Sequence, residues 1–239
     1  MSSKATTEAE IQRQYYAESA HKYNEMHDKE KGEHYFALGL LVATIDYFEI
    51  RSILDIGSGT GRAVAYLKSK CPQVKVVGIE PVSELRQIGY QNGLSEDELI
   101  DGDAMKLNFQ DGEFDMVCEF GVLHHVRNPE IMVAEMLRVA KKAIYISDAN
   151  NFGQGSPLTR AVKQLLNFLG LWKAAYLIQT KGKGYFISEE DGLAYSYSVF
   201  NNYKQIEAKC KHIHVLNTTA GNINPYKTAS HVALIGVKD

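Results

Sequence analysis

The 239-residue sequence has little cysteine and no long apolar run, and each shortage excludes a class of protein. Its three cysteines, Cys71, Cys118 and Cys210, show neither CxxC spacing nor the density of a disulfide-stapled secreted domain. The first residues lack the apolar core of a secretory signal, and no apolar stretch approaches the roughly 20 residues that span a bilayer. We therefore expect a cytoplasmic protein without stable membrane insertion.

A basic excess is also lacking. Lysine and arginine total 26 against 29 acidic residues, so the formal net charge is −3. Binding to nucleic acid requires a basic face, and none is expected here. The length and the 45% hydrophobic content suit one domain, residues 1–239, with a sizeable core. Charge and composition leave the oligomeric state open.

Strand and helix signals alternate through the middle of the chain. Short apolar runs that end in glycine or an acid predict buried strands at 52–57, 74–80, 98–104, 114–122 and 143–150. Amphipathic stretches predict helices at 61–70, 82–93 and 129–142. This alternation predicts an α/β fold in which a parallel sheet carries helices on both faces.

Both ends of the chain depart from this alternation. Residues 1–50 are expected to form an N-terminal helical cap, broken near residues 31–33. Residues 151–200 are expected to form an inserted substrate lid around one amphipathic helix at 158–178. That helix is basic enough to touch a membrane, but we interpret it as packing on its own domain. A helix near 201–210 precedes two strands, which close the fold as an antiparallel hairpin.

The stretch "ILDIGSGTGR" follows the first predicted strand, where open α/β sheets bind ligands. Its glycines let the backbone approach a ligand, and their spacing differs from the G-x-G-x-x-G of dinucleotide folds. Glu80 ends the next strand, where an acid can accept from both hydroxyls of a ribose. Asp103 ends the third, where an acid can accept from an adenine amine. The ligand is therefore an adenosine without a pyrophosphate.

With "VVGIEPVSEL", "GDAMKLNF" and "FDMVCEFGVLHHV", the chain resembles class I S-adenosylmethionine-dependent methyltransferases of the small-molecule type. The resemblance implies a Rossmann-like, seven-stranded, mostly parallel sheet with an antiparallel last strand, and S-adenosyl-L-methionine as cofactor. It implies that Asp55 orders the glycine loop near the methionine amino group, that Gly57 and Gly59 approach the amino-acid part, and that Glu80 binds the ribose. The remaining cofactor contacts that it implies are Pro81, Val82, Asp103, Ala104 and Met105 around the adenine, and Glu119 and Phe120 beside the sulfonium.

Two tyrosines and two histidines have alternative interpretations. Tyr16 and Tyr23 are seven residues apart and share a helix face, which either packs on the core or closes over the cofactor. A tyrosine face suits a sulfonium cation. His124 and His125 follow the fourth strand, where a histidine can act as general base for a hydroxyl acceptor. The alternative is that they only shape the loop.

The lid is rich in aromatic residues, and we expect Tyr185, Tyr195 and Tyr197 to contact the methyl acceptor. The predicted function is methyl transfer to a small molecule enclosed by the lid, with a hydroxyl of a sugar or secondary metabolite as acceptor. N-methylation of a small amine, and a non-catalytic partner subunit that only binds the cofactor, stay open. The glycine spacing argues against a dinucleotide-dependent oxidoreductase. No metal site is expected, because 148–151 has the pattern of a cap or turn.

Overall fold

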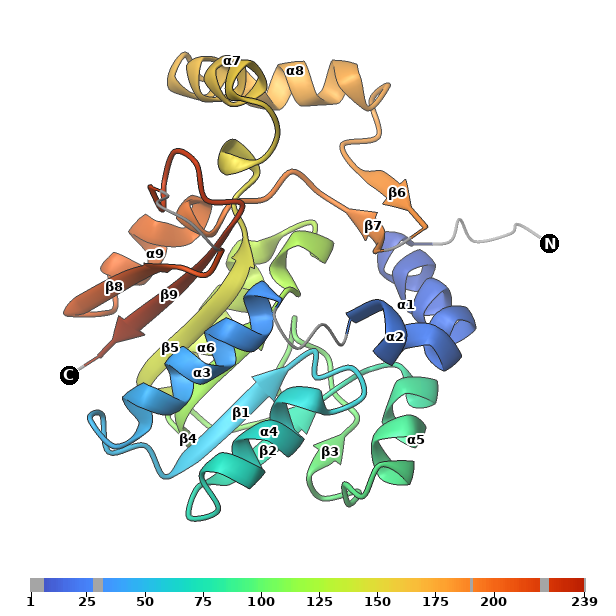
Figure 1. The fold of residues 1–239 in the computed structure, drawn as a ribbon, viewed down its shortest axis with the longest axis vertical. Coiled ribbons are helices and arrows are strands. Elements are labelled where there is room, and N and C mark those ends of the chain that lie inside the picture. The colour runs from blue at the N-terminus through green and yellow to red at the C-terminus, as the bar shows by residue number, and fades with distance from the viewer. Residues whose placement is uncertain (1–6, 28–31, 190, 220–223, 239) are drawn as a thin grey trace.

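The structure, a computed structural model, describes residues 7–27, 32–189, 191–219 and 224–238 (Figure 1). Its centre is a seven-stranded sheet of order β3-β2-β1-β4-β5-β9-β8. The strands in that order are Leu99–Ile100, Lys75–Ile79, Ser52–Ile56, Phe114–Phe120, Ala140–Ala149, His231–Val237 and His212–Asn217. Strands β1 to β5 pair in parallel, whereas β9 is antiparallel to both β5 and β8. The predicted sheet and closing hairpin are confirmed.

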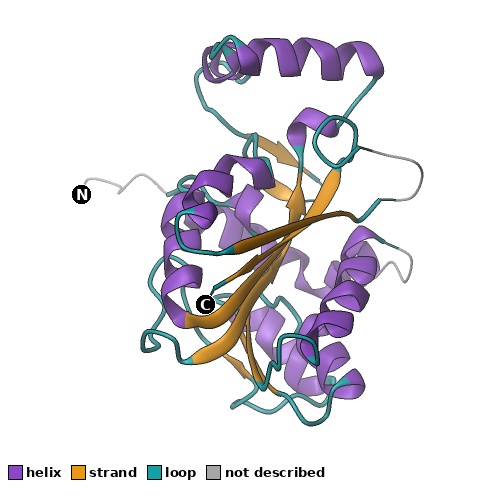
Figure 2. Cartoon of the chain, turned by 90° about the vertical axis from the view of Figure 1, so that its left-hand side faces the viewer, coloured by secondary structure: helices purple, strands orange, loops and turns teal. Residues whose placement is uncertain are grey.

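Helices cover both faces of this sheet, because successive strand residues point to opposite sides. Figure 2 shows the sheet with helices on either side. Ile53 of β1 packs into a core with α3 (Glu33–Ile45) and α4 (Arg62–Lys70). Its neighbour Leu54 packs into a second core with α6 (Pro129–Val139) and α9 (Tyr203–Glu207). Helix α5 (Ser83–Gln91) follows β2.

The predicted boundaries of one helix and one strand are wrong. The helix expected at 129–142 ends at Val139, because residues 140–142 begin the long strand β5. The third strand is reduced to two residues, after which the chain turns at Asp103. No helix in the described part of the chain is both long and apolar enough to cross a membrane.

The N-terminal cap consists of α1 (Glu8–Ser19), a 3₁₀ turn (Ala20–Lys22) and α2 (Tyr23–His27). Thr7 caps α1: its hydroxyl accepts from the backbone N–H of Glu10, while the Glu10 carboxylate accepts from that of Thr7. The predicted break near 31–33 falls partly outside the described residues, and α3 begins at Glu33.

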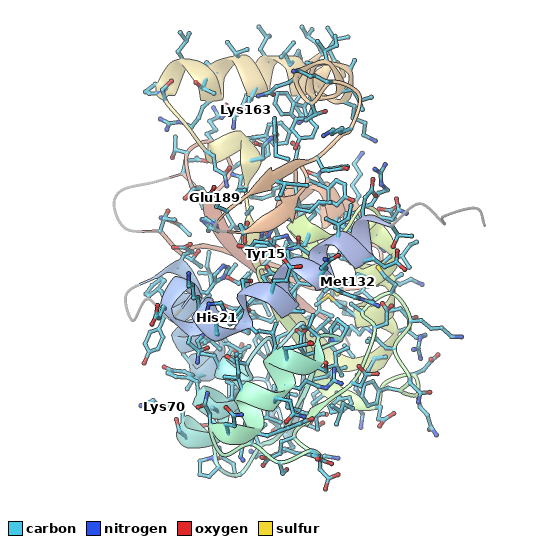
Figure 3. All side chains as sticks on the ribbon, turned by 90° about the vertical axis from the view of Figure 1, so that its right-hand side faces the viewer. Tyr15, His21, Lys70, Met132, Lys163 and Glu189 are labelled. Atoms are coloured by element: carbon cyan, nitrogen blue, oxygen red, sulfur yellow. The ribbon has the colours of Figure 1, made fainter. Side chains whose placement is uncertain are left out.

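The lid does not contain one helix at 158–178. Helix α7 (Pro157–Phe168) ends before Gly170, whose φ of +72° is left-handed, and α8 (Trp172–Gln179) starts in a new direction. A short hairpin of β6 (Phe186–Ser188) and β7 (Gly192–Ala194) returns the chain to the core. Figure 1 shows α7 and α8 as a layer at the top of the molecule. In Figure 3 the hairpin lies close to α1.

Candidate functional site

Three adjoining cavities lie at the carboxyl ends of β1, β2, β4 and β5. The first, of about 370 Å³, lies between α1 and the ends of β2 and β4 and is named here the nucleoside cavity. A niche of about 30 Å³ beside Asp55 continues it. The third, of about 910 Å³, lies under the lid and is named the acceptor cavity. Tyr195 lines both large cavities, and Arg62 lines both the niche and the acceptor cavity.

Two glycines of the loop after β1 occupy positions that have no room for a side chain. Gly57 and Gly59 have left-handed φ angles of +67° and +56°. A Cβ added at Gly59 would lie 2.4 Å from the Tyr23 hydroxyl, and one at Gly57 would lie 2.5 Å from a Val122 methyl. Glycine is favoured at both positions, and Gly57 presents bare backbone to the nucleoside cavity and the niche, whereas Gly59 lies under Tyr23 and lines none of the three cavities.

Glu80 holds this loop in place. Its Oε2 accepts a hydrogen bond of 3.0 Å from the Gly59 N–H, and its Oε1 accepts one of 2.9 Å from the Val82 N–H. Each oxygen keeps a further lone pair for a ligand in the nucleoside cavity, which Glu80 lines. Burial raises the pKa of this carboxyl to about 7, against the opposing effect of its two backbone donors.

Two buried carboxyls carry an oxygen without a partner. Among the described residues, Asp55 Oδ2 and Glu119 Oε1 accept no hydrogen bond. Burial raises the pKa of Asp55 to about 6, and burial together with the Asp148 charge raises that of Glu119 well above its usual range. Unpaired buried acceptors are costly and call for a donor or a cation. The niche beside Asp55 therefore fits a cationic group such as an ammonium.

The nucleoside cavity brings together most of the predicted cofactor residues. Its lining includes Tyr16, Tyr23, Gly57, Glu80, Pro81, Val82, Asp103, Ala104, Met105 and Phe120. Asp103 lies at its open rim, half exposed, with its Oδ2 in an ion pair of 2.9 Å with Arg13. Its Oδ1 accepts from the Met105 N–H, so one carboxylate serves both the turn and the rim.

Tyr16 and Tyr23 meet edge to face, with ring centroids 5.7 Å apart. They do not share one continuous helix, because the 3₁₀ turn at 20–22 separates α1 from α2. The turn reorients the chain so that Tyr23 covers Gly59 while Tyr16 reaches His125, with 3.1 Å between its hydroxyl and Nε2. Both tyrosines line the nucleoside cavity from the N-terminal cap, and both also pack against the buried cluster of Ala20, Val82 and Leu85.

His124 is held between two carboxylates. Its Nδ1 lies 2.7 Å from Asp148 Oδ1 and its Nε2 lies 3.1 Å from Asp191 Oδ2. Burial by itself lowers the pKa of His124, but the two carboxylates outweigh burial and hold the pKa well above its ordinary range. Both ring nitrogens therefore donate, and in this arrangement neither offers a lone pair to a substrate proton.

His125 faces the nucleoside cavity instead. Its Nδ1 donates to the Leu193 carbonyl at 2.7 Å, since a carbonyl can only accept. Its Nε2 lies 3.1 Å from the Tyr16 hydroxyl and 3.4 Å from Asp191 Oδ1. The ring thereby connects β7 of the lid to α1. Of the two histidines, His124 lines the acceptor cavity and His125 the nucleoside cavity.

The acceptor cavity has an apolar roof and a charged floor. Its roof is formed by α7 and α8, through side chains that include Leu158, Val162, Leu166, Trp172 and Tyr176. Its floor includes Glu33, His34, His124, Asp191 and His231. Of the three tyrosines expected to contact the methyl acceptor, Tyr195 and Tyr197 line this cavity. Tyr185 lies outside the lining, and its ring meets that of Tyr195 edge to face, with 6.1 Å between the ring centroids.

Several residues of this site were not predicted from the sequence. Asp148 was interpreted as part of a turn, yet it is fully buried at the end of β5. Gln12 of α1 accepts from the Leu193 N–H and donates to the Asp191 carbonyl, which fastens the cap to the lid hairpin. A single polar residue in a helix or hairpin carries no local signal of such long-range pairing.

Within the described part of the chain, two groups of side chains have the spacing of metal ligands. One atom each of Glu33, His34 and His231 lies within 4.8 Å of the other two, and the same holds for His124, His125 and Asp191. The second group is already engaged in the hydrogen bonds described above. In the first group, burial lowers the pKa of His34 to about 4 and also lowers that of His231, so both rings are neutral.

Known methyltransferases resemble part of this chain in sequence. Residues 54–146 match a family described as a methyltransferase domain. The norajmaline N-methyltransferase of Rauvolfia serpentina is 35% identical over 94 residues, 38% of this chain and 32% of that protein. The phosphatidylethanolamine N-methyltransferase of Cereibacter sphaeroides is 29% identical over 147 residues, 53% of this chain and 65% of that protein. The chain thus spans less than two thirds of the length of these relatives.

The fold likeness extends over nearly the whole chain. The crystal structure of magnesium protoporphyrin IX methyltransferase from Synechocystis PCC 6803, with bound SAH, superposes with a TM-score of 0.61. The two sequences are 13% identical, and the match covers 98% of this chain and all of the other. Residues 54–146 of this chain thus match a methyltransferase domain, and nearly the whole chain shares its fold with this solved methyltransferase.

Proposed function

We propose that this protein transfers a methyl group from S-adenosylmethionine to a small molecule with an apolar body. The observation that carries the proposal is the junction of the cavities. The nucleoside cavity and its niche supply a place for an adenosine and a charged amino-acid end, and Tyr195 separates them from a second, larger cavity under the lid. A group-transfer enzyme needs two such sites in contact.

The chain's own residues fit this cofactor. The Glu80 carboxylate, already fixed by two backbone donors, can accept from both ribose hydroxyls. The free Asp55 oxygen faces the niche and suits the ammonium of the methionine part. When bound, the cofactor supplies a methyl group activated by a positively charged sulfur. Tyr16 and Tyr23 would present aromatic faces to the ligand from the lining of the nucleoside cavity, whereas Glu119 is fully buried and lines none of the three cavities.

The work left to the protein is alignment and exclusion of water. The acceptor's lone pair forms a bond to the methyl carbon while the carbon–sulfur bond breaks and its electron pair stays on sulfur. An oxygen or nitrogen acceptor that carries a proton releases it during or after transfer. The roof of α7 and α8 holds the apolar body of the acceptor, and the floor receives its polar end.

A hydroxyl of a sugar or secondary metabolite is one candidate acceptor, and a small amine is the second. The carboxylates of Asp191 and Glu33 at the cavity floor favour a basic amine. The ion pairs of His124 favour it too, because they occupy the nitrogens that a hydroxyl acceptor would need as base. Within this proposal His124 positions Asp148 and Asp191, and His125 positions Tyr16.

A ligand screen followed by a turnover assay tests the proposal. Thermal shift and calorimetry with S-adenosylmethionine, S-adenosylhomocysteine, NAD and NADP should show stabilisation by the first two only. Formation of S-adenosylhomocysteine is then measured with panels of apolar amines and alcohols. Preference for NAD or NADP would overturn the cofactor assignment. Tight cofactor binding without turnover on any acceptor panel would favour a non-catalytic, cofactor-binding subunit.

A further inference from the structure

The outer side of the lid exposes apolar side chains that the acceptor cavity does not use. Six large apolar residues of α7, α8 and their connection are exposed and lie outside the cavity lining: Leu165, Phe168, Leu169, Leu171, Leu177 and Ile178. Phe168 is 85% exposed and Ile178 is 80% exposed. We name these six residues the outer lid surface. Figures 1 and 3 show α7 and α8 at one extreme end of the molecule.

Exposed apolar residues that gather on one element mark an interaction site, whereas single ones do not. Helix α7 has an apolar face toward the cavity and a second apolar group pointing away from it, so packing on its own domain accounts for only the first. Leu158, Val162 and Leu166 of α7 line the cavity, whereas Leu165 and Phe168 are exposed outside its lining.

The charge of the same segment is one-sided. Residues 149–188 contain no aspartate or glutamate and five cations: Arg160, Lys163, Lys173, Lys181 and Lys183. The whole chain has a net charge of −3, so the remainder carries −8. Lys163 points inward and donates to Asn151, whereas Lys173, Lys181 and Lys183 are exposed. The outer lid surface is therefore apolar and flanked by solvent-facing lysines.

This combination selects among possible partners. A second copy of the chain on the same surface would bring two clusters of lysines together, and like charges oppose that contact. An anionic bilayer satisfies both features, because apolar side chains enter the boundary between headgroups and acyl chains while lysines meet the anionic headgroups. We propose that the outer lid surface docks on a membrane that contains anionic lipids.

The docking surface adjoins the acceptor cavity. Leu158 is 75% exposed and Val162 is 48% exposed, yet both line that cavity. The edge of the cavity thus reaches the surface of α7. An acceptor with an apolar chain would pass from the bilayer into the cavity along these residues. This second step rests on the proposed methyl transfer, whereas the docking itself does not.

Vesicle co-sedimentation of the full chain tests the docking without any turnover. The protein should sediment with phosphatidylcholine vesicles that contain phosphatidylserine, and much less with phosphatidylcholine alone. Replacing Phe168 and Ile178 together by serine should weaken binding by about tenfold or more, since each side chain loses its apolar burial. Charge reversal of Lys173, Lys181 and Lys183 should weaken it by at least about fivefold per residue and remove its salt dependence.

Matched variants elsewhere on the surface serve as controls. Tyr47→Ser removes an aromatic side chain that is 82% exposed on the loop after α3. Charge reversal of Lys70, Lys75 and Lys209 changes the net charge by the same amount as the lid triple variant. Both controls should keep wild-type vesicle binding. An unchanged circular dichroism spectrum and melting temperature show that each variant is folded.

Three results would overturn the docking. They are failure of the wild type to sediment with anionic vesicles, equal loss in lid and control variants, and equal binding to neutral and anionic vesicles. A dimer in sedimentation velocity that Phe168→Ser dissociates would assign the surface to a second copy instead. Failure of the methyl-transfer assay with normal vesicle binding would contradict the proposed function and leave the docking intact.

Discussion

Glu80→Gln is the most informative single substitution, because this carboxylate has two tasks. Its two oxygens accept the Gly59 and Val82 N–H groups, at 3.0 and 2.9 Å, and both also face the nucleoside cavity. Glutamine keeps one acceptor oxygen and turns the other into an NH₂ group. That NH₂ group opposes a backbone donor, so one buried N–H loses its partner.

The size of the effect follows from these contacts. A hydrogen bond to a charged group contributes about 1.5–3 kcal/mol, and a buried N–H without a partner costs about 1–3 kcal/mol. Part of this loss already weakens the cofactor-free loop. Affinity for S-adenosylhomocysteine should therefore fall by about 10-fold to 100-fold, since about 1.4 kcal/mol is a factor of ten.

The pH dependence adds a second readout. The pKa of Glu80 is about 7 without ligand, raised from 4.5, so the carboxyl is partly protonated near neutral pH. Ribose hydroxyls donate to the carboxylate and favour its ionised form. Cofactor affinity should then rise as the pH rises through about 7, with proton release on binding, and Glu80→Gln should lose this contribution.

The linked effect on folding has the opposite sign. Because the folded pKa lies above its unfolded value, this carboxyl's contribution to stability is complete below about pH 4.5 and is lost as the pH rises through about 7. The melting temperature of the cofactor-free protein should therefore fall less steeply with rising pH in Glu80→Gln than in the wild type.

Isothermal titration calorimetry in buffers of different ionisation enthalpy measures affinity and proton release together. Glu84→Gln is the matched control, because Glu84 lies on the exposed first turn of α5 and should leave affinity unchanged. If Glu80→Gln bound S-adenosylhomocysteine as tightly as this control, with the same proton release as the wild type, the reasoning about the nucleoside cavity would be refuted.

Three further predictions concern the glycine loop, the two carboxylates that flank His124, and the lid. Gly59→Ala places a Cβ 2.4 Å from a tyrosine hydroxyl at a φ of +56°, so affinity for S-adenosylhomocysteine should fall at least about tenfold; unchanged calorimetry would contradict this. Asp191→Asn removes one of two charges on His124, whose pKa should fall in an NMR titration; an unmoved pKa would show that the contact is weak. Tyr197→Ala should lower turnover and spare cofactor binding, because Tyr197 lines the acceptor cavity alone, whereas Tyr195→Ala should weaken both. Equal effects of the two tyrosine variants on cofactor affinity would argue against two separate cavities.

The sequence by itself determined the parallel sheet and the end of the sheet where the ligand binds. Apolar runs of strand length alternate with amphipathic stretches, and this pattern is local. Asp55 lies near the carboxyl end of β1, Gly57 and Gly59 lie in the loop after it, and Glu80 follows β2 directly, so all four could be predicted as site residues from their places in the sequence. The carboxyl ends of parallel strands meet at one edge, so adjacency in the fold follows from position in the chain.

Tertiary structure alone decided the roles of the histidines and the shape of the lid. His124 looked like a base in the sequence, but Asp148 and Asp191, 24 and 67 residues away, occupy both of its nitrogens. Such long-range ion pairs leave no periodic trace. The lid helix was split at Gly170, a position that propensity tolerates within a helix but that adopts φ of +72° here. A sequence pattern fixes which face of an element is apolar, whereas only the packed molecule fixes what that face meets.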